Sequence, residues 1–453
     1  MIEVYRWRNL DRWDAFSIPH LHIAPHLPQK TIGELLAPRH ERVDRSQWSF
    51  DQLQPITIHF GGDISRRKMA AGTNYTMPLF WAKPGDVILS KIDLKNGAVG
   101  VLSEGWDNAV VTSHFKVYAP DLAQIDPRYF RMLLQTQDFK KWLWANRSGA
   151  DGRTEVKLDV FEALAIPMPP VTKQQSLCDA YSAALTRAEQ LEQEAEAIER
   201  AGWLAFETAL GVAAPPPLPD RPVFVARFKD VERWSHEGVL RALTQSPSST
   251  SNTLMVPLGQ MAKVSYGIQK CPANRPAVHA RPYLRVANVQ RGVLDLREIK
   301  YINVPDGEMP KLRLEVGDVL LCEGNSPDLV GRGAIWHGEI QDCVHQNHVL
   351  RVRVDREHLF PDFVLAVINS SHGQAYFRSK AKRTTNLASI NSKEVAGLPV
   401  PNLPLARQQD VLDELNAQVQ AAQCKRTKAA TLRQSAWTSF ESALFTTHEE
   451  LAA

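Results

Sequence analysis

The sequence predicts an α+β protein built from two tandem copies of one unit, each a β-rich domain with helices that is followed by a long helix. Three observations predict this fold class. Blocks of similar sequence recur at a nearly constant separation, strand-like and helix-like segments follow in the same order in both halves, and a seven-residue apolar repeat runs through the last helix of the first half. The 453 residues leave room for two or three domains.

The clearest internal repeat is a proline-rich block that ends in two glutamines. IPMPPVTKQQ, which begins at Ile166, recurs as VPNLPLARQQ from Val400, a separation of 234 residues. At the same separation, W-x-x-F-E-x-A-L from Trp203 recurs from Trp437. The separation is shorter further upstream, so the first part of each copy has diverged by insertion. Other matches in the same order are Pro127 with Pro361, Gly85 with Gly317, and Arg12 with Arg233.

Each copy begins with short β-rich segments bounded by glycine, aspartate and asparagine, which favour tight turns. We expect strands at residues 87–89, 99–102 and 115–118 in the first copy and at 319–321, 334–336 and 349–354 in the second. One helix follows in each copy, at 127–144 and at 361–378, with a proline in its first turn.

A long helix ends each copy. In the first it covers about residues 173–210, with apolar and small residues alternately four and three apart, the spacing of a coiled-coil seam. The long helix of the second copy has a weaker version of this seam spacing. Two alternatives are open, because the helices could pair with each other or each could lie on its own domain. The expected seam residues are Leu177, Tyr181, Ala184, Ala188, Leu191, Ala195 and Ile198, with Val411, Leu415, Val419 and Ala422.

Charge is distributed unevenly along the chain. Residues 176–211 hold 2 Lys/Arg against 7 Asp/Glu, and residues 410–453 hold 4 against 6, although the whole chain carries a net charge of +3. The other segments are therefore basic and suit phosphate groups, whereas the acidic helices suit solvent or a protein partner. The glutamates between 192 and 199 lie on a helical face and indicate a solvated surface, not acid–base chemistry.

Several classes of protein are not expected. The first ten residues do not resemble a secretory signal and no apolar stretch of about 18 residues occurs, so we expect a cytoplasmic protein with no membrane partner. The five scattered cysteines, with no CxxC pair, indicate reduced thiols. No P-loop and no amino-methyltransferase motif occurs, so neither a catalytic centre nor a bound cofactor is expected in this chain.

One arrangement invites a metal site, Cys343-x-His345-x-x-His348. Alternation along a strand would place Cys343 and His345 on one face and His348 on the other, and no fourth ligand cluster is evident. We therefore expect no metal there, nor at the three histidines between residues 20 and 26.

The order of a Gly-Asp-Val strand, a helix, a Pro-rich block with Gln-Gln and a coiled-coil helix, used twice, resembles the specificity subunit of type I restriction-modification systems. The resemblance covers nearly the whole chain, and also rests on GDVLLCEGNSPDLVGRGAIW from Gly317 and HQNHVLRV from His345. It implies two target-recognition domains, at 1–172 and 223–406, each docking on half of a split DNA site. It implies an antiparallel coiled coil of conserved helices at 173–211 and 407–446, with a Pro-rich linker at 212–222 and a tail at 447–453.

The resemblance also implies partners for a non-catalytic chain: double-stranded DNA, two modification (methyltransferase) subunits and two restriction (translocase and nuclease) subunits. S-adenosylmethionine, ATP and Mg²⁺ would belong to those partners. A helix of 30 residues spans about 45 Å, and B-DNA repeats its grooves every ~34 Å. Rigid helices would therefore hold the two recognition domains a fixed distance apart, so we expect a spacer of constant length. Because the reading portions differ between the copies, we expect the half-sites to differ too.

Basic residues near turns are candidates for phosphate contacts, and amides for base edges. The loops 148–154 and 382–386 are favoured, because both are basic, polar and placed alike in the two copies. The candidate DNA-binding residues are Arg66, Arg67, Lys68, Lys91, Lys95, Arg147, Ser148, Arg153, Asn325, Arg332, Gln346, Asn347, Lys380, Lys382 and Arg383.

Two other classes of function stay open. A coiled-coil scaffold would join proteins without reading bases, and would bind every duplex equally. An enzyme with an unrecognised active site would show nuclease or methyltransferase activity once a metal or a methyl donor is added.

Overall fold

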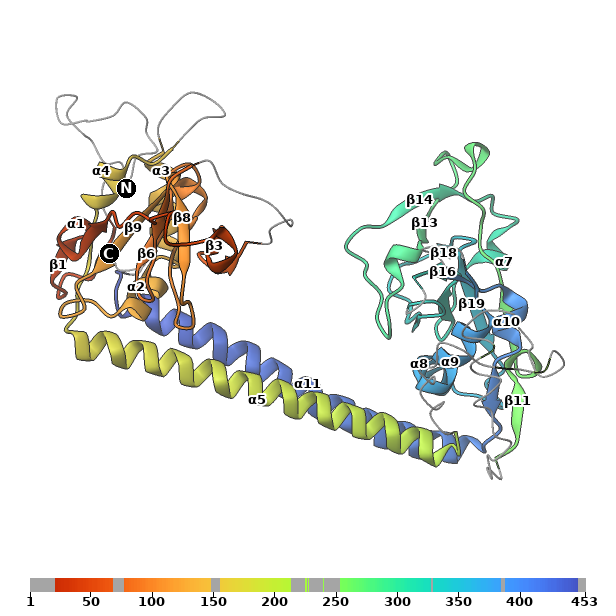
Figure 1. Cartoon of the computed structure of the whole chain (residues 1–453). Helices are drawn as coiled ribbons and strands as arrows, with labels where there is room; N and C mark the ends of the chain where they lie inside the picture. The colour runs from red at the N-terminus through yellow and green to blue at the C-terminus, as the bar shows by residue number, and fades with distance from the viewer. Residues whose placement is uncertain are drawn as a thin grey trace. The chain divides into compact units, whose positions relative to one another are not determined.

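The computed structural model describes residues 21–67, 77–147, 155–212, 225, 227, 239, 253–326, 329–383 and 388–446. They form two compact units: the first unit contains residues 1–192 and 427–453, and the second unit contains residues 193–426. The predicted fold class is confirmed. Two β-rich domains with helices are joined by two long helices, α5 (Val171–Ala209) and α11 (Leu405–Ser442), which pack together (Figure 1).

In the first unit, two four-stranded sheets and a two-stranded ribbon carry the short helices. One sheet has the order β2 (Leu36–Arg39), β9 (Phe115–Pro120), β6 (Val87–Ser90), β7 (Val99–Val101), all antiparallel. The other has the order β4 (Ile64–Arg66), β3 (Gln54–Ile58), β8 (Ala109–Thr112), β5 (Leu79–Trp81), with β3 and β8 parallel. The ribbon pairs β1 (Gln29–Thr31) with β10 (Ala165–Pro167). The short helices are α1 (Ile32–Leu35), η2 (Phe50–Gln52), η3 (Leu94–Asn96), α2 (Pro127–Leu133), α3 (Gln137–Ala145) and α4 (Leu158–Glu162).

The second unit has a sheet of the order β12 (Ala262–Ser265), β19 (Val349–Val354), β15 (Val319–Cys322), β17 (Gly333–Ile335). Two three-stranded sheets have the orders β14 (Lys300–Asn303), β13 (Ala280–Leu284), β18 (Val344–His345) and β16 (Gly324–Asn325), β21 (Ala388–Ser389), β20 (Lys382–Arg383). A ribbon pairs β11 (Met255–Pro257) with β22 (Pro399–Pro401). The short helices are η5 (Leu258–Gln260), η6 (Pro272–Asn274), η7 (Val286–Asn288), α7 (Met309–Leu312), α8 (Pro361–Asn369), α9 (Ser371–Lys380) and α10 (Ser392–Ala396).

The antiparallel sheets β2-β9-β6-β7 and β12-β19-β15-β17 have the same strand order and register. Arg39 faces Val117 in the first sheet, and Ser265 faces Arg351 in the second. Val117 and Arg351 are 234 residues apart, which is the separation of the Pro-rich blocks. Positions in the two domains can therefore be matched one by one from the strand pairing.

The repeated Gly-Asp before the central strands β6 and β15 makes the turn that starts each strand. Gly85 and Gly317 have φ of 86° and 92°, a left-handed conformation that suits glycine. The carboxylates of Asp86 and Asp318 are buried and accept the backbone N–H three residues earlier, at 2.8 and 2.7 Å. The motif is therefore explained by local backbone geometry.

The prediction of one helix at 127–144 and one at 361–378 is wrong, because each segment is two helices. The side chains of Thr136 and Ser370 accept the backbone N–H of Phe139 and Gly373 and so cap α3 and α9 at their N-termini. A hydroxyl that caps a new helix ends the previous one, because its residue is in an extended conformation.

The first glutamine of each Gln-Gln pair is fully buried and fixes the start of a long helix. Gln174 Oε1 accepts the backbone N–H of Asp126 at 2.9 Å, and its Nε2 donates to the carbonyls of Gln124 and Pro169 at 3.0 and 2.8 Å. Gln408 makes the same three bonds at 2.8 to 3.0 Å. Its partners are Phe360, His358 and Leu403.

The phenylalanine of W-x-x-F-E completes the hydrophobic core of the domain in the other copy. Phe440 of α11 is buried in the first unit, with its ring 6.0 Å from that of Tyr129 in α2. Phe206 of α5 is buried in the second unit, 6.3 Å from Phe363 of α8. Each domain is thus completed by the helix that begins in the other half of the sequence.

The glutamate of the same motif binds a helix N-terminus. Glu441 accepts the backbone N–H of Gln137, the first residue of α3, at 3.0 Å. Glu207 accepts that of Ser371, the first residue of α9, at 2.6 Å. A carboxylate is stabilised there by the unpaired N–H groups and the helix dipole. These contacts explain why the motif recurs.

In the first unit, α5 and α11 pack through small residues. Ala188, Leu191 and Ala429 are buried in one apolar cluster. Tyr181 meets Trp437 edge to face at 5.5 Å. Of the other expected seam residues in this unit, Leu177 borders the domain core and Ala184 is half-buried.

In the second unit, the helices approach each other closely at a glycine. A Cβ added to Gly202 would lie 2.7 Å from the Cβ of Gln418, which is too close for a real contact. Ala195 and Ala422 are fully buried, so small residues line the interface here too. Among the other expected seam residues, Val411 and Leu415 are buried and Ile198 and Val419 are half-buried.

Ion pairs show that the helices are antiparallel. Glu192 pairs with Arg433 at 2.8 Å in the first unit, and Glu194 with Lys425 at 2.5 Å in the second. In the first unit, Tyr181 contacts Trp437 and Glu192 contacts Arg433, so residue numbers increase along α5 while they decrease along α11. These pairs are partly exposed and add little stability, so the buried alanines determine how closely the helices pack.

We expect Ala188→Leu to lower the free energy of unfolding of the first unit by about 1–3 kcal/mol, because three extra carbons cannot fit where Ala188 is fully buried. Urea unfolding followed by tryptophan fluorescence would measure this. Ala183→Leu, on an exposed face of α5, is the matched control and should change stability by less than about 0.5 kcal/mol. Equal effects of the two variants would contradict the helix pairing.

Candidate nucleic-acid interfaces

In the second unit, the small sheet β16-β21-β20 brings several predicted residues together. Ala388 faces both Asn325 and Arg383, and Ser389 faces Lys382. Lys380, at the end of α9, lies just before this sheet. Residues far apart in sequence thus meet at one sheet, which places their backbones side by side.

The turn 345–348 is held against the same region. The backbone N–H of Glu323 donates to the carbonyl of His348 at 3.0 Å, and a Glu323 carboxylate oxygen lies 2.6 Å from His348 Nδ1. The backbone N–H groups of Gln346 and Asn347 donate to Leu284 and Ile268, at 2.9 Å each. Gln346 and Asn347 are half-buried, and these hydrogen bonds fix the backbone of their turn.

His345 supports this turn from beneath. It is fully buried, and its Nδ1 donates to the carbonyl of Val349 at 2.7 Å. Its Nε2 is buried with no hydrogen-bond partner. Burial disfavours the imidazolium and lowers the pKa of His345 to about 4.

Acidification is expected to destabilise the second unit through His345. Its folded pKa of about 4 lies below the unfolded value of about 6.5, so the stabilisation is complete above pH 6.5 and is lost as the pH falls to 4. The loss approaches about 3 kcal/mol. Urea unfolding at several pH values should show a weaker pH dependence for His345→Asn than for the native chain. The same dependence in both would exclude His345 as its source.

The backbone carbonyl of Arg332 accepts the N–H of Cys322 at 3.0 Å, next to this region. The Arg332 side chain is half-buried and donates to the carbonyl of Val286 at 3.3 Å, while its Nε is buried without a partner. A guanidinium held in this way supports the loop around η7.

In the first unit, the described candidates lie in three separate segments. Lys91 and Lys95 follow β6, where Lys91 Nζ donates to the carbonyl of Ser113 at 2.8 Å. Arg66 of β4 lies 5.5 Å from the ring of Trp106, and exposed Arg67 follows it. Arg147, after α3, lies 3.6 Å over the exposed ring of Trp144. Lys68, Ser148 and Arg153 lie outside the described residues, as do the loop 148–154 and residues 384–386 of the second loop.

The structure adds basic residues that the sequence did not suggest. Arg39, His40 and Lys116 line a pocket of the first unit together with Lys91. Arg39 and Lys116 lie within strands β2 and β9, and His40 directly follows β2. Loop composition therefore gave no signal for them, because the strand pairing brings them together.

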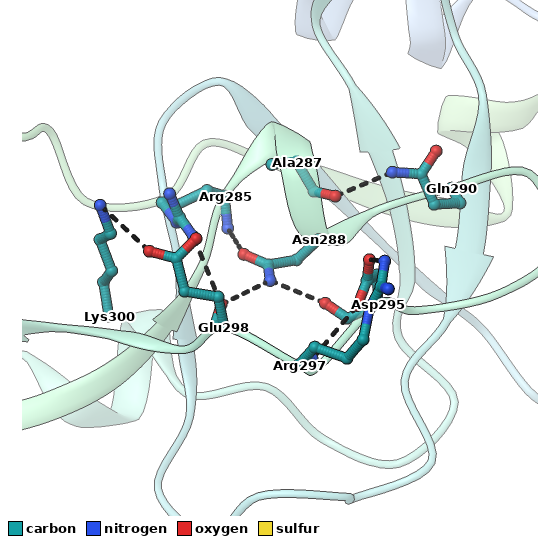
Figure 2. Close-up of polar contacts among 8 residues, drawn as sticks. All are labelled: Arg285, Ala287, Asn288, Gln290, Asp295, Arg297, Glu298 and Lys300. Atoms are coloured by element: carbon teal, nitrogen blue, oxygen red, sulfur yellow. Dashed lines mark hydrogen bonds and ion pairs between the residues drawn. The ribbon is translucent and has the colours of Figure 1, made fainter. Parts of the chain in front are cut away.

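Another basic cluster of the second unit neutralises its charges internally, as Figure 2 shows for the turn after β13. The amide of buried Asn288 accepts the N–H of Arg285 and donates to the carbonyls of Asp295 and Glu298. Glu298 pairs with Arg285 at 3.2 Å. Hydrogen bonds from Arg297 lower the pKa of Asp295 to about 2. These cations already have carboxylate partners, so the cluster shapes the loop.

Neither a metal-binding group of His, Cys, Asp and Glu nor a helix able to cross a membrane is found in the part of the chain that the structure describes. Buried Cys343 and His345 do not converge with His348, which turns to Glu323. The three residues of C-x-H-x-x-H thus take part in core packing and hydrogen bonds of the second unit.

No family model matches the chain. The assigned type I restriction enzyme MjaX specificity subunit of Methanocaldococcus jannaschii is 26% identical over 131 residues, 29% of this chain and 31% of that protein. The type I restriction enzyme EcoKI specificity subunit of Escherichia coli K12 is 20% identical over 260 residues, 57% of this chain and 51% of that protein. The chain is therefore similar in sequence to type I restriction enzyme specificity subunits. The matched regions span about a third and a half of these relatives' own lengths.

A solved chain from a study of complex assembly and conformational transition in the type I R-M system has the same fold as this chain. The TM-score is 0.58 at 17% identity, over 92% of this chain and 97% of that one.

Proposed function

We propose that this chain is a specificity subunit that reads a bipartite DNA target, one half-site with each target-recognition domain, residues 1–172 and 223–406. One observation carries the proposal: the two domains repeat one sheet and register but differ at matching positions of the loop after the central strand. Lys91 follows that strand in the first domain, and Glu323 in the second. A common fold favours a similar mode of docking, and different side chains favour different half-sites.

The long helices support a spacer of constant length. At 1.5 Å per residue, the 39 residues of α5 extend about 58 Å. Both ends are anchored, since buried Gln174 fixes the start and Phe206 and Glu207 fix the end. A continuous helix anchored in this way resists a change of length.

We further propose that the chain acts in the cytoplasm with two modification and two restriction subunits. Those partners would hold S-adenosylmethionine, ATP and Mg²⁺, whereas this chain supplies sequence choice. Exposed acidic residues of α5, such as Glu189 and Glu196, suit contact with a protein partner.

A genome-wide map of methylated adenines, in cells with and without this chain, tests the proposal. We expect one bipartite motif, with unequal half-sites and a constant spacer, to lose its methylation when the chain is removed. An unchanged methylation map, together with equal affinity for all duplexes, would favour the coiled-coil scaffold instead.

A further inference from the structure

We infer that a pocket in the first target-recognition domain binds a phosphate group. The pocket lies where the ends of β2 and β9 meet the turn after β6, and has a volume of about 90 Å³. It is lined by basic, aromatic and small residues and by no acid. The lining residues are Arg39, His40, Phe80, Lys91, Ser113, Phe115, Lys116 and Val117.

Two cations of this pocket, Lys91 and Lys116, have no ion-pair partner among the described carboxylates. Arg39 is balanced by buried Asp86, whose carboxylate lies 2.8 Å from its Nε. Lys91 donates to the carbonyl of Ser113, which carries no net charge. Lys116 is half-buried and forms no ion pair with a described carboxylate. Two ammonium groups thus share a partly enclosed site, where an anion would relieve their repulsion.

The size and chemistry of the pocket favour a phosphate group over a larger ligand. A volume of about 90 Å³ is well below the roughly 300–1,000 Å³ of sites for drug-sized ligands. A tetrahedral oxyanion is compact and offers several acceptors to ammonium and guanidinium donors. The rings of Phe80 and Phe115 exclude water from part of the wall and so strengthen those contacts.

The second domain has lost this pocket at the matching positions. Strand pairing matches Lys116 with Leu350, which is fully buried, because they face Leu89 and Leu321. The loop position of Lys91 is held by Glu323. An acid and an apolar residue replace the two lysines, so the pocket is a feature of the first domain and not of the shared fold.

The counterpart of Arg39 shows how the second domain uses the same space. Ser265 occupies that register position, and its hydroxyl accepts a hydrogen bond from Arg351 Nε at 3.2 Å. The guanidinium of Arg351 also donates to the carbonyls of Arg313 and Lys311, at 2.9 and 3.1 Å. The chain's own cation fills this position in the second domain, whereas in the first domain the matching region is an open, basic pocket.

The source of the phosphate follows from the proposed function, on which this part of the inference rests. Lys91 lies on the loop that differs between the two domains, so a DNA backbone phosphate bound there would orient that loop over the bases. A contact of this kind is independent of sequence and contributes to the salt dependence of binding.

The test measures the affinity of the full chain for a duplex of arbitrary sequence at several salt concentrations. Lys116→Gln should reduce the slope of log affinity against log salt by about 0.9, the effect of one lost phosphate contact. Lys116→Arg should keep the native slope, which guards against a folding defect. Lys141→Gln, at an exposed lysine of α3, is the matched control and should also keep it.

A second measurement separates DNA from free phosphate. The ³¹P line width of inorganic phosphate is followed with the native chain and with Lys116→Gln. If Lys116→Gln removes the line broadening but leaves the salt slope of DNA binding unchanged, the pocket binds phosphate and the proposal that the phosphate comes from DNA is overturned. Unchanged slopes and no broadening would overturn the inference altogether. A native chain that binds no duplex would contradict the proposed function, and the phosphate titration would then decide the pocket alone.

Discussion

Removal of one heptad from both long helices is expected to abolish methylation at the original target and to create a target whose spacer is about three base pairs shorter. Seven residues correspond to about 10 Å of helix, and one base pair of B-DNA to ~3.4 Å. The half-sites should not change, because the recognition domains are untouched.

The structure indicates where the two cuts belong. Deletion of residues 189–195 from α5 and 425–431 from α11 removes facing segments, because Glu194 pairs with Lys425 and Ala188 packs near Ala429. A whole heptad preserves the face that carries the buried alanines. A map of methylated bases would report the spacer. A matching heptad insertion is the control, and it should lengthen the spacer by the same amount. If both variants kept the original spacer, the helices would not determine it.

Replacement of a buried glutamine at the start of a long helix should have the largest effect on stability. Gln408→Ala leaves the N–H of Phe360 and the carbonyls of His358 and Leu403 without their partner. A buried polar group that loses its partner costs about 1–3 kcal/mol. We therefore expect the second unit to lose at least about 3 kcal/mol of unfolding free energy, measured by urea unfolding.

The neighbouring glutamine provides a matched control. Gln409 is exposed and reaches only Asp413, one turn further along the helix. Gln409→Ala should change the unfolding free energy by less than about 0.5 kcal/mol. Gln174→Ala and the exposed Gln175→Ala form the same pair in the first unit. Equal losses within each pair would show that the buried hydrogen bonds are not the source of stability.

The architecture was predictable because duplicated sequence reports duplicated contacts. The Pro-rich block, the Gly-Asp turn and W-x-x-F-E recur because each side chain meets the same partners twice, as Gln174 and Gln408 do. The partners themselves were not predictable, because Glu441 and Gln137 are 304 residues apart and no local pattern joins them. The helix break at Thr136 was missed although a hydroxyl before a new helix is a local capping signal.

The candidate interfaces were predictable only in outline. Turn composition indicated Asn325, Gln346 and Lys382, and the structure brings their backbones into one region. Which DNA group each of them contacts stays a prediction. The pocket at Lys116 was not predictable, because a lysine in a strand is usually a solvated residue and only the pairing of β9 with β2 and β6 brings it to Arg39 and Lys91.

The buried position of Phe440 beside Tyr129 has a consequence for the order in which the chain folds during synthesis. The first domain emerges from the ribosome long before α11. Glu441, whose carboxylate accepts the N–H of Gln137, is synthesised 304 residues later. Until α11 is synthesised, the apolar surface of the first domain that Phe440 covers is exposed to chaperones and proteases. Interrupted translation would therefore leave a first domain with an incomplete core, which cellular quality control can recognise.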